Sequence, residues 1–123
     1  MMRKRSLYVL AALWFATLQP AMAQQTGPHG GLLAGKAGHQ TELVVTATEL
    51  AVYIIDHGKV HDAKGVRLRA VIQQDGKTTS VDFAVEGSRL LAKLAAPLGA
   101  GAVVVLTGRD EHGDVISSRY VLK

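Results

Sequence analysis

Residues 42–56 read ELVVTATELAVYIID and contain two apolar runs, Leu43–Val45 and Leu50–Ile55, separated by the polar residues Thr46–Glu49. Val, Ile and Tyr dominate both runs, and these residues fit a pleated, buried surface. The second run shows no polar alternation, which is typical of a strand covered on both faces. The stretch therefore predicts two neighbouring strands at the centre of a packed sheet. The connecting turn lacks the Gly or Asp-Gly that usually closes such a hairpin.

Further strands are expected on both sides of this stretch. Residues 66–73 alternate between apolar and polar side chains, and Asp75-Gly76 is a strong hairpin signal. In the return strand, Val81, Phe83 and Val85 should face inward. Turn signals every eight to twelve residues and the absence of helical periodicity predict an all-β fold, an antiparallel immunoglobulin-like β-sandwich of seven to eight strands. The expected strands are 32–34, 40–46, 50–56, 66–73, 77–85, 89–94, 103–107 and 115–122.

The first 23 residues have the pattern of a secretory signal peptide. Arg3, Lys4 and Arg5 precede an apolar run at 7–18, and Ala21-Met22-Ala23 offers small residues before a cleavage point. A membrane anchor is disfavoured because the run is short for a bilayer. We expect export to the periplasm, with no membrane insertion after cleavage. The predicted organisation is a signal peptide at 1–23, a flexible Gly/His lead-in with a short edge strand at 24–38, and the sandwich at 39–123.

Charge and composition exclude several classes of protein. The chain carries a net charge of +4, but three basic residues lie in the first segment, so eleven basic residues face ten acidic ones afterwards. Such a neutral surface gives no indication of nucleic-acid binding. The absence of Cys excludes disulfides and thiolate metal sites. Motifs of nucleophile elbows, phosphate loops, dinucleotide sites and zinc proteases are missing, so we expect no enzyme.

Histidine stands out in this composition, with five residues beyond position 23. Imidazole together with carboxylate suits Cu(II), Zn(II), Ni(II) or Co(II). His29 lies in a Pro-His-Gly-Gly segment able to fold back on a metal, and the glycine-rich chain between His29 and His39 could bring these two together. Glu42 follows His39 by three positions, which in a regular strand places the two on opposite faces. The alternatives are a solvated imidazole at His29 and a strand-end imidazole bonded to backbone at His39.

A second group of candidates follows the central strand. His57 and His61 could converge across a turn, with Asp56 or Asp62 as a carboxylate partner. For this segment alone, the favoured interpretation is a solvated loop, or a turn that Asp56 caps through its own backbone. We expect His112, in a charged turn, to be a turn residue.

A group of residues along the chain resembles a known pattern. The order is Pro28-His29-Gly30-Gly31, then His39 with Glu42-Leu43-Val44, then Tyr53 and Asp56. This order resembles small periplasmic proteins associated with heavy-metal resistance, and an extra domain in membrane-fusion subunits of cation efflux systems. The resemblance implies a β-sandwich and a link to the handling of Cu, Zn, Co or Ni.

Together these observations predict a periplasmic protein that binds a divalent transition metal weakly, as a buffer, shuttle or efflux accessory. His29 and His39 would be the primary ligands, with Glu42, Asp56 or His57 completing the sphere. Metal efflux components are the expected partners. The alternative is a non-metal interaction module that offers a sheet edge to another protein of the cell envelope. A purely structural domain is a third interpretation.

Overall fold

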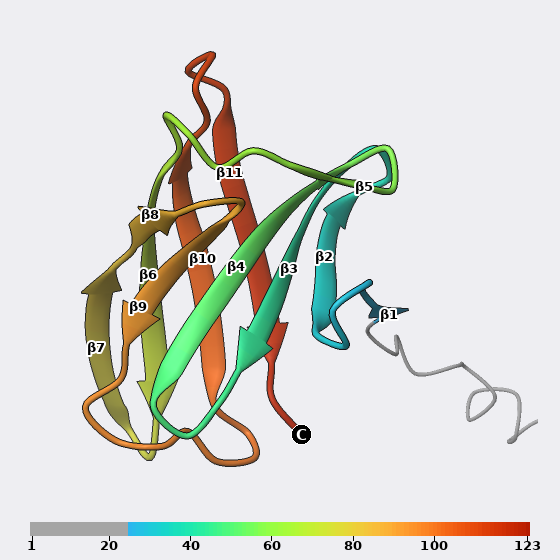
Figure 1. Cartoon of the computed structure of the whole chain (residues 1–123). Helices are drawn as coiled ribbons and strands as arrows, with labels where there is room; N and C mark the ends of the chain where they lie inside the picture. The colour runs from blue at the N-terminus through green and yellow to red at the C-terminus, as the bar shows by residue number, and fades with distance from the viewer. Residues whose placement is uncertain (1–24) are drawn as a thin grey trace, which may run out of the picture.

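The computed structural model describes residues 25–123, and the predicted signal peptide lies outside them. The described residues form eleven strands and no helix, so no helix among them could cross a membrane. The strands make two antiparallel sheets that pack face to face, as Figure 1 shows. The prediction of an all-β sandwich is confirmed.

The larger sheet has seven strands and the smaller has four. The order in the larger sheet is β1 (Gln25–Thr26), β2 (Leu32–Lys36), β3 (His39–Val45), β4 (Glu49–Asp56), β9 (Arg89–Lys93) and β8 (Ala84–Glu86), with β5 (Lys59–His61) also paired to β4. The order in the smaller sheet is β11 (Val115–Val121), β10 (Val103–Arg109), β6 (Arg67–Gln74) and β7 (Lys77–Asp82).

The predicted central pair is β3 and β4, and β4 is flanked by β3, β9 and β5. Strands β1 and β5, of two and three residues, are not among the expected strands because such short segments carry no apolar run. The strand expected at 77–85 is divided into β7 and the three-residue β8, which belong to different sheets. The β3–β4 turn closes without glycine. The Thr46 hydroxyl accepts a hydrogen bond from the Glu49 amide at 3.1 Å, and the Thr46 amide donates to the Glu49 carbonyl at 3.0 Å. A local hydroxyl bond of this kind replaces the usual turn glycine.

The alternation predicted for β6 is confirmed, since Leu68, Ala70 and Ile72 are buried there. The prediction is wrong for Val85, which is 45% exposed. Here the chain leaves the smaller sheet after β7 and joins the edge of the larger one as β8. Because β8 is the edge strand of the larger sheet, Val85 stays exposed although the apolar alternation predicted that it faces the core.

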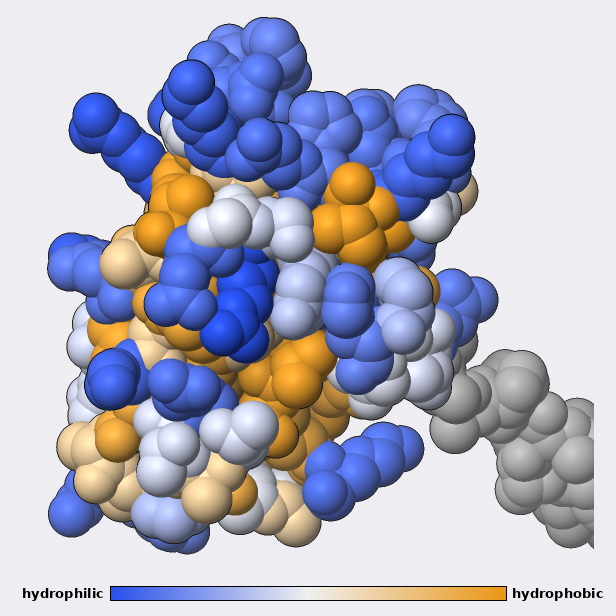
Figure 2. Space-filling view, in the orientation of Figure 1, coloured by the Kyte–Doolittle hydropathy of each residue, from blue (hydrophilic) through white to orange (hydrophobic). Residues whose placement is uncertain are grey.

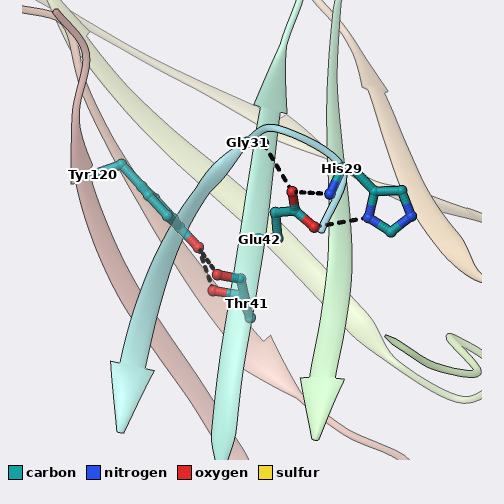
Figure 3. A network of polar contacts seen from close by, with 5 residues as sticks. All are labelled: His29, Gly31, Thr41, Glu42 and Tyr120. Carbon is teal, nitrogen blue, oxygen red and sulfur yellow. Dashed lines mark hydrogen bonds and ion pairs between the residues drawn. The ribbon is translucent and has the colours of Figure 1, made fainter. Parts of the chain in front are cut away.

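The core is built from aliphatic side chains of both sheets and one aromatic residue, Tyr120, which is fully buried. The Tyr120 hydroxyl donates to the Thr41 carbonyl at 2.8 Å and also contacts the Thr41 hydroxyl, which lies 2.7 Å from that of Ser118. These contacts join β3 of one sheet to β11 of the other (Figure 3). They satisfy the polar groups that enter the core with Tyr120.

Tyr120 should make the fold sensitive to alkali. Burial raises the pKa of Tyr120 to about 12, against 10.0 for an ordinary tyrosine. The folded state therefore holds this proton more tightly than the unfolded chain does. The contribution of the protonated Tyr120 to the free energy of unfolding is complete below pH 10 and is lost between about pH 10 and 12. The expected loss is roughly 3 kcal/mol, at 1.36 kcal/mol for each pKa unit.

The measurement is the free energy of unfolding in urea as a function of pH, for the protein and for Tyr120→Phe. The difference between the two profiles isolates the Tyr120 titration. Parallel profiles between pH 9 and 12 would contradict the prediction.

Candidate functional site

Glu42 is a fully buried carboxylate on the outer face of the larger sheet. The segment before β2 folds over it and supplies hydrogen bonds, which Figure 3 shows. The His29 and Gly31 amides both donate to Oε2 at 2.8 Å, and Nδ1 of His29 lies 2.8 Å from Oε1. A buried carboxylate requires such partners because its desolvation is otherwise costly.

The His29 ring also stacks on Tyr53, with ring centroids 3.6 Å apart and planes inclined by 8°. Tyr53 lies directly opposite Glu42 in the β3–β4 register. Arg89 also interacts with Tyr53. The pKa of Arg89 is raised, chiefly by its hydrogen bond to Glu86 and further by the one to Tyr53, while desolvation acts in the opposite direction. We call the set of His29, Gly31, Glu42 and Tyr53 the clasp, since it fastens the lead-in to the sheet.

Two glycines permit this close approach. A Cβ at Gly27 would overlap Cδ of Glu42, and a Cβ at Gly31 would overlap the Leu43 carbonyl oxygen and lie 2.8 Å from Cγ2 of Val44. The Gly27 amide also donates to the Gly31 carbonyl at 2.8 Å. Gly27 and Gly31 are therefore required by the turn that presents His29 to Glu42.

A second cluster, the His39 cluster, contains His39, Asp56 and His57. His39 and Asp56 are paired across β3 and β4. His57 follows in the β4–β5 turn with a φ of +51°, and Gly58 has a φ of +82°, the pattern of a two-residue hairpin turn with positive φ at both positions. Nδ1 of His57 lies 2.8 Å from Oδ1 of Asp56, and Nδ1 of His39 lies 3.6 Å from the same oxygen.

These separations have the scale of a metal coordination sphere. Ligand atoms about 2.0–2.1 Å from a tetrahedral Zn(II) lie roughly 3.3 Å from one another. The two imidazole rings are 5.6 Å apart between centroids, and their side chains are 80% and 76% exposed. As they stand, the residues in 25–123 include no group of three or more His, Cys, Asp or Glu that could hold an ion. Binding by the His39 cluster therefore requires its exposed rings to turn.

The structure sorts the five predicted ligands into two groups, with His29 and Glu42 in the clasp and His39, Asp56 and His57 in the other cluster. It does not bring His29 and His39 together. Residues three apart on a strand project to opposite faces of the sheet. Glu42 therefore binds His29 on the outer face, while the side chain of His39 lies on the inner face. In the clasp, Glu42 accepts from Nδ1 of His29, which leaves the lone pair of Nε2 as a single possible ligand atom for a metal.

Sequence reasoning named Tyr53 only through the resemblance and did not identify its role. The β3–β4 register places Tyr53 opposite Glu42, and the register was the signal that could have revealed it. Arg89 belongs to β9, which pairs with β4 but lies far from it in the sequence, and no pattern in the sequence linked it to Tyr53.

We compared the chain with protein-family models, curated proteins and solved structures, and found no match in any of the three.

Proposed function

We propose that this protein binds a divalent transition-metal ion reversibly in the periplasm, at the His39 cluster, as a buffer or shuttle. The observation that supports the proposal is the convergence of two imidazoles on one carboxylate oxygen, at 2.8 and 3.6 Å. Two imidazoles and a carboxylate are a ligand set for Zn(II), Cu(II), Ni(II) or Co(II). The role beside a metal efflux system rests on the resemblance of the Pro-His-Gly-Gly pattern.

The exposure of the cluster suits transient rather than permanent binding. His39 and His57 lie largely in solvent, so another protein can reach a bound ion. Three protein ligands leave coordination positions open to water or to a recipient's side chain. Protons compete with metal for imidazole, so affinity should fall in acidic solution.

Calorimetric titration with each of the four ions tests the proposal. The protein should bind at least one of them. The double variant His39→Gln, His57→Asn should lose roughly tenfold or more in affinity, since the loss of even an outer-shell partner of a ligand costs about 10–100-fold. Asn is chosen at position 57 because it accepts the positive φ of this turn.

Two further variants locate the site. His112→Gln removes another exposed imidazole, 73% exposed and outside the cluster, and should leave binding unchanged. His29→Gln tests the clasp and should also leave it unchanged. Loss of binding in His29→Gln, or full binding by the double variant, would contradict the assignment. Absence of heat with all four ions would contradict the function.

A further inference from the structure

A cavity of about 650 Å³ lies where β2, β3 and β4 approach β11 and the turn before it. Its volume falls within the range of small-molecule sites, about 300–1,000 Å³. The lining surface is mostly apolar and includes Ile54, Val66, Val115 and Ile116. Val115 is 67% exposed and lies beside the other aliphatic lining residues. The cavity therefore offers apolar area to a molecule from solvent.

The same cavity carries an excess of negative charge. Its lining carboxylates are Asp56, Asp62, Asp110, Glu111 and Asp114, and its basic side chains are Lys36 and the imidazoles of His39, His61 and His112. Figure 2 shows hydrophilic side chains crowded at this end of the molecule, with hydrophobic surface beside them. The site thus combines an apolar lining with an acidic rim.

The carboxylates differ in their availability. Asp62 accepts a hydrogen bond from the Lys64 amide, and Asp110 accepts from the amides of His112 and Asp114, so both stabilise their own turns. Within residues 25–123 the structure records no hydrogen bond or ion pair for the Asp114 carboxylate. Glu111 contacts only Nε2 of His112, at 3.5 Å. Glu111 and Asp114 are therefore the carboxylates available to a ligand.

We propose that this cavity binds a small organic cation with an apolar body, of the class of protonated alkylamines. The aliphatic lining would hold the apolar body, and Glu111 and Asp114 would hold the ammonium group. An anionic amphiphile would meet repulsion from the rim, and a small cation without an apolar body would leave the lining unused. The charge and the lining together thus select for both features of the ligand.

The experiment compares three probes by NMR titration of the ¹⁵N-labelled protein, all below any micelle concentration. Octylammonium should give saturable shifts confined to residues around the cavity, in β4 and at the start of β11. Octanoate tests the sign of the charge, and tetramethylammonium tests the need for an apolar body. Both should bind at least roughly tenfold more weakly than octylammonium.

Matched variants test the rim. Glu111→Gln with Asp114→Asn should weaken octylammonium binding roughly three- to tenfold, as expected for two exposed charge contacts. Asp75→Asn removes one carboxylate in the β6–β7 turn, outside the cavity lining, and should have no effect. Equal binding of octanoate or tetramethylammonium, an unchanged affinity of the rim variant, or shifts spread over the whole surface would overturn the proposal. The cavity includes His39 and Asp56 of the His39 cluster, so the titrations are run without metal ions. The contacts proposed for the ammonium group are Glu111 and Asp114, which are not in that cluster, so the rim variant can fail while metal binding by the His39 cluster persists.

Discussion

Replacing Gly108 with Ala is expected to destabilise the protein by about 3 kcal/mol, at the upper end of what inserted atoms cost in a packed interior. Gly108 lies in β10, opposite Leu68 of β6 and Ile116 of β11. A Cβ there would overlap the carbonyl oxygen of Arg67 and lie 3.0 Å from Cα of Leu68. Both obstacles are backbone atoms, so no side chain can turn away to relieve them.

Gly99→Ala is the matched control. The nearest atom to a Cβ at Gly99 is Oε1 of Gln74, at 3.6 Å, an ordinary contact. Urea denaturation should give a free energy of unfolding within about 0.5 kcal/mol of the original protein for Gly99→Ala. If Gly108→Ala were as stable as the control, β10 would have to pack less closely against β6 than the structure shows.

Much of the fold could be predicted because burial leaves a direct trace in the sequence. The continuous apolar run of β4 marks a strand with neighbours on both sides, and the alternation in β6 marks one buried face. Strand β5 left no such trace, and β8 could be predicted only as the end of one strand at 77–85, not as a separate strand of the other sheet. Each has three residues, all exposed, and each exists because a longer strand offers it a free edge. Pairing of this kind depends on the tertiary structure, which local composition does not record.

The candidate site also has features that the sequence could predict and features that depend on the tertiary structure. The two-residue period of a strand correctly separates His39 from Glu42, which lie on opposite faces of β3. The partner of His29 could not be predicted, because it depends on where the Gly27–Gly31 turn places the ring. Likewise His57 owes its position to a turn with positive φ, a conformation that only Gly58 signals in the sequence.

Glu42→Ala is expected to release the lead-in while leaving the rest of the sandwich folded. The substitution removes the acceptor of the His29 and Gly31 amides and of the His29 ring. Unsatisfied donors buried in place would cost about 1–3 kcal/mol each. Since the lead-in can swing into water, the protein avoids that cost by opening locally. Hydrogen exchange should show the Gly31 amide exchanging at least roughly tenfold faster, the equivalent of 1.4 kcal/mol.

The amide of Leu106, in the central strand β10, serves as the reference in the same experiment. Its exchange should change little, because its side chain is fully buried in the core and β10 belongs to the smaller sheet, whereas the clasp lies on the outer face of the larger sheet. Equal acceleration at both amides would mean that Glu42 stabilises the whole domain, and would contradict local opening.

Glu42→Gln separates the role of charge from the role of hydrogen bonding. An ionised carboxylate only accepts, so Nδ1 of His29 must carry the proton in the clasp. A Gln side chain could keep its oxygen on the two amides, while its NH₂ group would donate to Nδ1 and move the ring proton to Nε2. Protection of the Gly31 amide should then survive, and imidazole ¹⁵N shifts should report the reversed tautomer. If Gln instead released the lead-in as fully as Ala, the negative charge of Glu42 would be what holds His29 in place.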